Sequence, residues 1–192
     1  MTSKTIGVLA LQGAFQKHID ILQSLGYKTQ PVRRRDELKR CSALIIPGGE
    51  STTMTHLLRT GNLVDALKSF AAEYPVMGTC AGMILMSSTA TGHDVEALQI
   101  MDFEVQRNIY GTQRESFSSN LHLNVDPEGP PFRAMFIRAP GVTQLSHEIT
   151  VLARHQEQPV LIAQGHHLAA SFHPELTPDN RIHDYWLKRF HQ

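Results

Sequence analysis

The chain has 192 residues, of which 41% are hydrophobic, and its 18 Lys and Arg residues balance 18 Asp and Glu residues. A chain of this length and composition can bury one substantial core, and a neutral chain has no electrostatic reason to bind nucleic acid or an anionic membrane. Its one basic cluster, Arg33–Arg35, is followed at once by Asp36 and Glu37, so we expect a solvated surface turn there.

The sequence predicts a soluble, cytoplasmic protein. The apolar run near the N-terminus is broken by Gln12 and Gly13, so it is too short and too poorly flanked for a signal peptide. No stretch approaches the roughly 20 apolar residues that a bilayer span requires. In a reducing compartment the two cysteines, Cys41 and Cys80, are expected to be catalytic or buried instead of bridged.

Strand-like and helix-like segments alternate in the first half of the chain. The segments of strand length and pattern are Thr5–Leu11, Tyr27–Val32, Ala43–Ile46 and Val76–Gly78. Apolar residues at helical spacing mark Ala14–Leu25, which Gly26 follows where a C-cap is expected, and Leu63–Tyr74, which Pro75 stops. This alternation predicts a parallel sheet covered by helices on both faces.

The second half contains more strands and more turns. Its candidate strands are Phe103–Gln106, Leu121–Val125, Ala134–Ile137, Thr150–Ala153, Pro159–Ala163 and Leu168–Phe172. Asp126–Pro131 is expected to be a loop, and a final helix is expected from about Asp179 to Phe190. Because no linker separates the halves, the sequence predicts one α/β domain over residues 1–192. Ligands of such sheets bind beyond the carboxyl ends of the strands, where two Gly-rich turns fall.

The second of these turns holds Gly78, Cys80 and Gly82 in the spacing G-x-C-x-G. This is the cysteine version of the nucleophile elbow, a sharp strand-to-helix turn that holds a nucleophile at a strained, exposed apex. A helix expected from about Ala81 points its dipole and free N–H groups at the sulfur, which favours the reactive thiolate. The N–H of Ala81 can also serve as an oxyanion donor.

A buried structural cysteine is the alternative for Cys80. The strand and helix signals on either side of the turn favour the nucleophile. Cys41 provides the contrast, because it precedes the run Ala43–Ile46 without glycine framing, and we expect it to be structural.

A thiol nucleophile needs a base, and the base needs an orienting group. Among the 11 histidines, His173 follows an apolar strand and precedes Pro174, which enforces an extended backbone at His173. Residues i and i+2 of an extended chain point to the same side, so Glu175 can reach the imidazole and stabilise its charged form. The alternative is a strand-end histidine followed by a solvated glutamate.

The other histidines give no signal for a metal site. His166 and His167 are adjacent and would point to opposite faces of an extended segment. Neither they nor His183 has the spacing of metal ligands with a cysteine or a carboxylate. We therefore expect no metal.

With Cys80 first and His173-Pro174-Glu175 near the C-terminus, the chain resembles the class I, triad-type glutamine amidotransferases. The order nucleophile, histidine, acid differs from that of the α/β-hydrolases, in which the acid precedes the histidine. Further motifs make the chain similar to the family of glutaminase subunits of pyridoxal 5′-phosphate synthases. They are Gly7–Ala14, Pro47–Thr53, Gly78–Gly82, Arg107-Asn108, Phe136–Pro140 and Ser171–Leu176. The resemblance implies a flavodoxin-like three-layer sandwich with a mostly parallel central sheet.

The resemblance also implies the roles of site residues. Cys80, His173 and Glu175 would form the catalytic triad, and Gly49 would be an oxyanion donor beside Ala81. The residues expected to bind glutamine are Gly48, Gly49, Glu50, Arg107, Ile137 and Arg138. Glycines allow close backbone approach to a ligand, and an arginine suits an amino-acid carboxylate. In the same loop, Ser51 is a candidate N-cap of a following helix.

By the same resemblance, the chain would hydrolyse L-glutamine to L-glutamate and ammonia through a γ-glutamyl thioester on Cys80, without a cofactor. The ammonia would pass to a separate synthase subunit that builds pyridoxal 5′-phosphate from a pentose phosphate and a triose phosphate. Two alternatives stay open. One is a glutaminase subunit for another acceptor, such as imidazole glycerol phosphate synthase, which partner binding would reveal. The other is a catalytically idle scaffold, for which Cys80→Ala would change nothing measurable.

Overall fold

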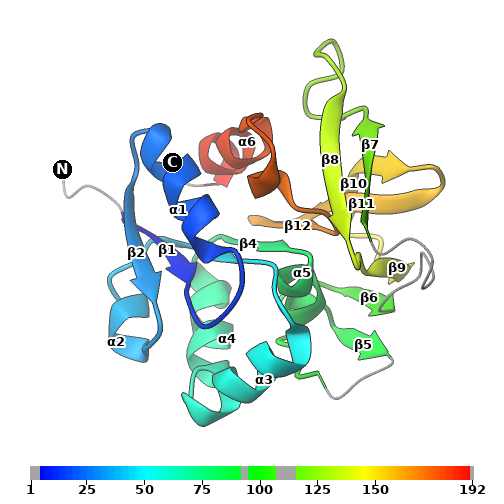
Figure 1. Cartoon of the computed structure of the whole chain (residues 1–192). Helices are drawn as coiled ribbons and strands as arrows, with labels where there is room; N and C mark the ends of the chain where they lie inside the picture. The colour runs from blue at the N-terminus through cyan, green and yellow to red at the C-terminus, as the bar shows by residue number, and fades with distance from the viewer. Residues whose placement is uncertain (1–4, 92–94, 107–115, 191–192) are drawn as a thin grey trace.

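The computed structural model describes residues 5–91, 95–106 and 116–190, and a seven-stranded sheet lies at its centre (Figure 1). Its strands are β1 (Thr5–Leu9), β2 (Lys28–Val32), β3 (Ala43–Ile46), β4 (Val76–Thr79), β10 (Thr150–His155), β11 (Gln158–Gln164) and β12 (His167–Ala170), in the order β10-β11-β12-β4-β3-β1-β2. Strands β2, β1, β3, β4 and β12 run parallel, whereas β11 and β10 extend the sheet as an antiparallel hairpin. The mostly parallel sheet expected from the sequence is confirmed.

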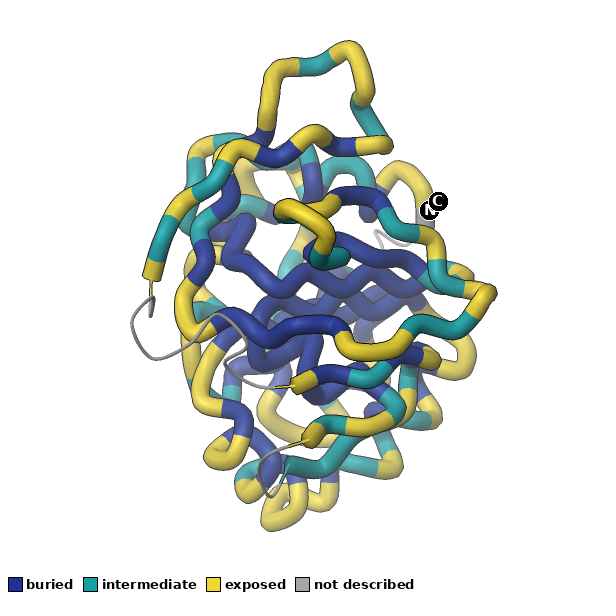
Figure 2. Tube along the Cα trace, turned by 90° about the vertical axis from the view of Figure 1, so that its right-hand side faces the viewer, coloured by how far each residue is buried: buried dark blue, intermediate teal, exposed yellow. Residues whose placement is uncertain are grey.

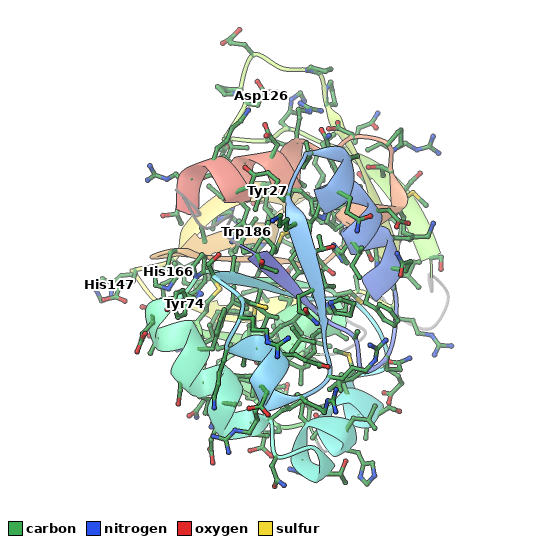
Figure 3. The ribbon with its side chains drawn as sticks, turned by 90° about the vertical axis from the view of Figure 1, so that its left-hand side faces the viewer. Tyr27, Tyr74, Asp126, His147, His166 and Trp186 are labelled. Carbon is green, nitrogen blue, oxygen red and sulfur yellow. The ribbon has the colours of Figure 1, made fainter. Side chains whose placement is uncertain are left out.

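Helices cover both faces of this sheet. They are α1 (Phe15–Ser24), α2 (Arg35–Leu38), α3 (Ser51–Thr60), α4 (Val64–Glu73), α5 (Ala81–Met86) and α6 (Arg181–Phe190), and a 3-10 turn, η1, spans Pro174–Leu176. Buried side chains of α3, α4 and α5 pack on one face, and those of α1 and α6 pack on the other (Figure 1). Figure 3 shows Trp186 between α6 and the sheet, where its side chain is fully buried. Alternate residues of β3 and β4 supply the two layers, as Leu44 and Ile45 of β3 do.

Two small sheets complete the layers. One contains β5 (Thr89–Thr91), β6 (Phe103–Gln106) and β9 (Gly141–Leu145), and the other pairs β7 (Ser116–Leu121) with β8 (Phe132–Ile137). Phe103 and Val105 join the core cluster of α4 and α5, whereas Phe132 and Phe136 join that of α1 and α6. Figure 2 shows the buried strands at the centre of the chain, and β3, β4 and β12 are buried along their whole length.

The carboxyl ends of β1, β3, β4 and β12 meet at one edge of the sheet, because these four strands are parallel neighbours. Four segments leave the sheet at this edge: residues 10–14, residues 47–50, Cys80 and residues 171–173. Since open α/β sheets bind ligands beyond the carboxyl ends of their strands, this edge is where a site is expected.

Local signals set several of the element boundaries. Helix α1 ends as predicted, because Gly26 directly after its C-cap adopts φ +84°, a conformation that glycine reaches without strain. The basic cluster Arg33–Arg35 is exposed, as expected, at the start of α2. None of the helices in the described ranges is long and apolar enough to cross a membrane.

The structure differs from the predicted elements in the second half of the chain. The expected strand Leu121–Val125 is wrong, because β7 ends at Leu121 and the chain then turns. Leu121 and Leu123 are buried in the core, so their apolar pattern reflects burial without strand pairing. The strands β5 and β9 were not expected.

Helix α3 was expected only as the helix that Ser51 would cap, and its first residues correct the role given to Ser51. The N-cap is Glu50, whose carboxylate accepts the N–H groups of Thr52 at 3.2 Å and Thr53 at 2.6 Å. Ser51 is the first helical residue. A carboxylate can cap a helix in this way because it is also favoured by the dipole of the helix N-terminus.

His167 makes the stability of the fold depend on pH in acid. It begins β12, is buried, and accepts the N–H of Val76 through Nδ1 at 3.2 Å. Burial, with a smaller effect of His166, lowers the pKa of His167 from 6.5 to about 4. Between these two pH values only the unfolded chain takes up the proton, so stability falls as the pH falls through this window.

We expect the free energy of unfolding to fall by about 3 kcal/mol between neutral pH and pH 4 because of the lowered pKa of His167. The variant His167→Asn keeps an acceptor for the N–H of Val76 but has no titratable group at this position. Its free energy of unfolding should therefore fall by about 3 kcal/mol less than that of the wild-type chain over the same pH range. Urea unfolding at a series of pH values measures the difference. Equal losses in the two proteins would contradict the assignment.

Candidate active site

Cys80 occupies a sharp turn between β4 and α5. Its φ of +50° and ψ of −106° are rare for a residue with a side chain, and its carbonyl oxygen accepts the N–H of Ile84 at 3.2 Å. A Cβ on Gly82 would collide with the carbonyl oxygen of Ile46, and one on Gly78 would lie 2.7 Å from the backbone of Gly82. The two glycines therefore permit the turn, as their spacing predicts.

The expected exposure of this turn is wrong. Cys80 is only 6% exposed, and its Sγ lies 3.5 Å from the carbonyl oxygen of Ile137. The sulfur thus lies against Ile137, the last residue of β8, and the next residue, Arg138, has a strained backbone with φ +45°.

His173 and Glu175 form a buried pair close to Cys80. His173 Nδ1 and Glu175 Oε1 are 2.7 Å apart. A Cβ on Gly48 would collide with the His173 ring and lie 3.3 Å from the Cβ of Cys80, so the three residues are packed together. The pair forms for a different backbone reason from the expected one, because Glu175 belongs to the 3-10 turn η1 and not to an extended chain. The turn brings the carboxylate back to the imidazole.

The charges of this cluster favour a protonated imidazole. Burial alone would lower the pKa of His173, but its hydrogen bonds with Cys80 and Glu175, and their charges, raise it to about 10. Burial alone would raise the pKa of Glu175, but His18 and His173 hold it below its ordinary value. An imidazolium beside a cysteine stabilises the thiolate, which is the nucleophilic form.

A cavity of about 420 Å³ opens beside Cys80. The predicted site residues that line it are Gly48, Gly49, Glu50, Cys80, Ala81, Ile137, Arg138 and His173. Glu175 lies behind His173 and does not line the cavity. Arg107 lies outside the described residues. The structure thus brings together segments that are far apart in the sequence.

Four further residues line the cavity that the sequence did not predict: Gly13, Ala14, Ser51 and Ile84. Gly13 has φ +92°, and a Cβ there would collide with the carbonyl oxygen of Gly48, which accepts the N–H of Ala14 at 3.2 Å. The motif Gly7–Ala14 contained the signal for this loop. Ser51 Oγ is buried and has no hydrogen-bond partner within the described part of the chain.

Hydrogen bonds fix the backbone of the glycine turn. The N–H of Gly48 donates to Thr79 Oγ1 at 3.1 Å, and the N–H of Glu50 donates to Gln12 Oε1 at 2.8 Å. As far as the structure is described, the N–H of Gly49 makes no such bond. Burial opposes ionisation of Glu50, but the bonds from Thr53 and Thr52 lower its pKa to about 2, so its side chain serves the cap of α3.

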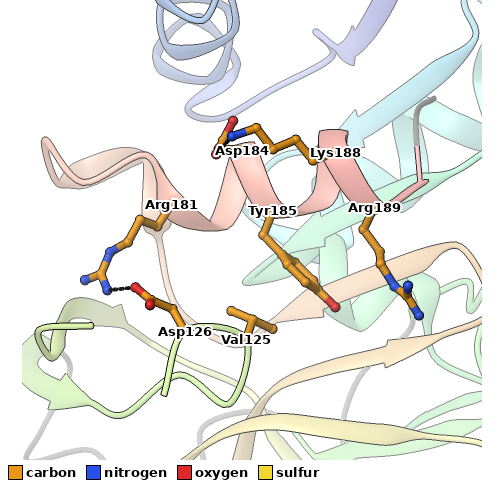
Figure 4. Close-up of a pocket in the computed structure, with 7 residues that line it drawn as sticks. All are labelled: Val125, Asp126, Arg181, Asp184, Tyr185, Lys188 and Arg189. Atoms are coloured by element: carbon orange, nitrogen blue, oxygen red, sulfur yellow. Dashed lines mark hydrogen bonds and ion pairs between the residues drawn. The ribbon is translucent and has the colours of Figure 1, made fainter. Parts of the chain in front are cut away.

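A second cavity of about 400 Å³ lies along α6 (Figure 4). Its residues are Val125, Asp126, Arg181, Asp184, Tyr185, Lys188 and Arg189. Arg181 donates to Asp126 at 2.8 Å and to Asp179 at 2.7 Å. None of these lining residues is a cysteine or histidine, so the chemistry of a thiol and its base belongs to the first cavity.

The other histidines in the described part of the chain do not line the first cavity. The ring centroids of His166 and His167 lie 4.2 Å apart in an edge-to-face arrangement, because the segment is not extended, which was the condition for their pointing to opposite faces. His166 belongs to the turn before β12, and its Nε2 lies 3.3 Å from the carbonyl oxygen of Ala71. Among the residues that the structure describes, no three His, Cys, Asp or Glu side chains are arranged to hold a metal ion.

Comparisons with known proteins agree on one family. The model of the SNO glutamine amidotransferase family matches residues 8–192. Pyridoxal 5′-phosphate synthase subunit PdxT of Pelotomaculum thermopropionicum is 48% identical over 185 residues, which cover 96% of this chain and 94% of that protein. The PdxT of Halalkalibacterium halodurans is 45% identical over 184 residues, or 95% of this chain and 93% of that protein.

Solved structures agree with this assignment. One described as a glutamine amidotransferase matches with a TM-score of 0.88 and 41% identity, covering 95% of this chain and 97% of its own. PurLQS from Thermotoga maritima matches with a TM-score of 0.71 and 14% identity, covering 95% and 92%. At that identity the likeness shows the fold alone.

Proposed function

This chain belongs to the SNO glutamine amidotransferase family, and we propose that it hydrolyses L-glutamine with Cys80 as nucleophile, His173 as base and acid, and Glu175 as the group that orients His173. The family expected from the sequence is confirmed. The observation that carries the assignment of roles is the buried 2.7 Å contact between His173 and Glu175, next to a cysteine with left-handed backbone.

The first half of the reaction forms a thioester. The Cys80 thiolate attacks the side-chain amide carbon of glutamine, and a tetrahedral intermediate forms with a negative oxygen. The N–H groups of Ala81 and Gly49 are our candidates for the oxyanion donors, since both residues line the cavity. His173 gives its proton to the amide nitrogen, the C–N bond breaks, and ammonia leaves.

The second half regenerates the enzyme. A water molecule attacks the γ-glutamyl thioester and passes its proton to His173, the C–S bond breaks, and glutamate leaves with the thiolate restored. Glu175 remains a carboxylate throughout, because its charge stabilises the imidazolium. No step requires a cofactor.

Substrate binding is assigned to the same cavity. We propose that Arg138 and Arg107 recognise the carboxylate of glutamine, and that Ile137, Gly48 and the backbone of Glu50 form the walls. The volume of about 420 Å³ accommodates one amino acid. Ser51 adds a buried hydroxyl that can bond to the substrate.

The acceptor of the ammonia follows from the relatives. Their name describes a subunit of pyridoxal 5′-phosphate synthase, and this chain is 48% identical to one of them. We propose that the chain works in the cytoplasm and passes ammonia to a synthase subunit that builds pyridoxal 5′-phosphate.

Glutamate release from glutamine by the purified chain tests this function, measured with and without a pyridoxal 5′-phosphate synthase subunit. We expect release that rises when the synthase is added. If the rate of release is the same with and without the synthase, the glutaminase activity stands but the synthase is not its partner. If neither mixture releases glutamate, both assignments are wrong.

Gly48→Ala should lower kcat for glutamine about 100-fold or more, because the added methyl group would collide with the His173 ring and displace it. Gly26→Ala is the matched control. Its methyl group meets nothing within 4 Å, but φ is +84°, so it should cost stability and leave kcat unchanged. Steady-state assays with thermal unfolding separate the two effects. Similar kcat values for both variants would show that Gly48 has no special place at the site.

A further inference from the structure

Two buried histidines lie directly behind the triad. His18 of α1 and His183 of α6 are both fully buried in the layer formed by these helices. His18 Nε2 lies 3.4 Å from Glu175 Oε2, and His18 Nδ1 lies 2.9 Å from His183 Nε2. The sequence did not single out His18. The contacts extend the triad into a line of side chains that runs from His173 through Glu175 to His183.

The partners of each ring nitrogen decide where the protons lie. If Nε2 of both rings carries the proton, the N–H of His18 faces Glu175 Oε2, an oxygen 3.4 Å away that has no hydrogen-bond partner in the described ranges, and His183 donates to His18 Nδ1. In the reverse arrangement, a lone pair of His18 would face the carboxylate. His183 Nδ1, which has no partner in the described ranges, would then be a buried donor without an acceptor. The first arrangement is therefore favoured.

Both rings are neutral donors in this arrangement. Burial lowers the pKa of His18 in spite of Glu175, and burial together with His18 lowers the pKa of His183 to about 3. A neutral N–H supports the carboxylate without taking its charge away. The negative charge of Glu175 thus stays available to His173, which lies 2.7 Å from its other oxygen.

His18 also reaches the glycine turn. Its Nε2 lies 3.3 Å from Thr79 Oγ1, and that hydroxyl accepts the N–H of Gly48 at 3.1 Å. One imidazole therefore contacts both the acid of the triad and the residue that anchors the wall of the cavity.

We propose that His18 is a positioning residue of the glutaminase site, which holds Glu175 against His173 and is held in turn by His183. The proposal rests on the proposed function, since it concerns the same triad. His18 touches neither the cavity nor the sulfur, so it acts through Glu175.

Two variants of similar shape separate positioning from simple packing. His18→Gln places an N–H near the position of Nε2, which faces Glu175, whereas His18→Asn retains only a polar atom near Nδ1, which faces His183. His56→Asn replaces an exposed histidine of α3 and serves as the control. We expect His18→Asn to lower kcat for glutamine about tenfold or more with little change in KM, and His18→Gln to recover most of the loss.

The assays use the chain with a pyridoxal 5′-phosphate synthase subunit, and a second readout is the rate at which iodoacetamide alkylates Cys80 at one neutral pH. That rate should fall in His18→Asn and recover in His18→Gln. Equal loss in both variants, or wild-type kcat and alkylation in both, would overturn the proposal. If the wild-type chain releases no glutamate, the proposed function fails, but the alkylation rates still decide the role of His18.

Discussion

Cys80→Ala should abolish glutamate release, with kcat reduced about 10,000-fold or more, because among the described residues no other nucleophile lines the cavity in position to form the thioester. Ser51 also carries a hydroxyl that could in principle act as a nucleophile, but it lies at the start of α3. The imidazole of His173 packs against Cys80 and Gly48 and not against Ser51. Loss of activity with unchanged thermal stability is the expected pattern. It is measured by a glutamate assay and by thermal unfolding.

Cys41→Ala is the matched control for the loss of a thiol. Cys41 is 6% exposed, like Cys80, and its Sγ lies 3.4 Å from the carbonyl oxygen of Glu37. Burial, with the charge of Glu37, raises its pKa to about 11, so it stays an unreactive thiol. Its removal should cost about 1 kcal/mol of stability and leave kcat unchanged. The assignment is wrong if Cys41→Ala loses the activity and Cys80→Ala keeps it.

Glu175→Gln should lower kcat about 1,000-fold while the chain stays folded. An amide has no charge to stabilise the imidazolium, and if its NH₂ group faces His173 it imposes the wrong tautomer on the ring. The pKa of His173, which is about 10 in the intact cluster, should fall toward its ordinary value. A pH titration of the His173 ring signals by NMR measures this shift, alongside the assay.

Glu37→Gln tests whether any well-bonded glutamate gives this result. Its carboxylate accepts the N–H groups of Arg33 at 2.7 Å and Arg34 at 3.0 Å, and these bonds hold its pKa below the usual value. It lies away from the cavity, so kcat should not change. A Glu175→Gln variant as active as Glu37→Gln would remove Glu175 from the mechanism.

The sequence predicts the central strands well because they are buried on both faces. β1, β3 and β4 are continuous apolar runs ended by glycine, proline or a polar turn, and their residues are almost wholly buried. In contrast, β7 has the sequence SFSSNL, which is no apolar run, and it forms a two-stranded sheet with β8. Its partner supplies the stabilising contact, the stacking of Phe117 on Phe136.

Helix α3 shows a second limit of sequence patterns. Its residues STTMTHLLRT include several β-branched threonines, which favour helices weakly. The helix depends on its cap by Glu50 and on the burial of Met54 and Leu58, which only the folded layer supplies. Local propensity is outweighed by these contacts.

The site could be predicted only as far as local patterns reach. The elbow around Cys80 and the pair His173 and Glu175 are short segments with their own signals. His18 and Thr79 lie near Glu175 because the strand order of the sheet places α1 and β4 beside η1. No residue spacing along the chain predicts this proximity.

The position of β12 has a consequence for how the chain acquires activity. Strand β12 pairs with β4 in parallel, and the N–H of Cys80 donates to the carbonyl oxygen of Ala170 at 2.8 Å. The contact between Val76 and His167 joins positions 91 residues apart. Pairings this distant form slowly, because a long loop must close before they gain any contact. During synthesis Cys80, the proposed nucleophile, emerges well before His173, its proposed base, and we expect a nascent chain to release no ammonia until β12 is in place.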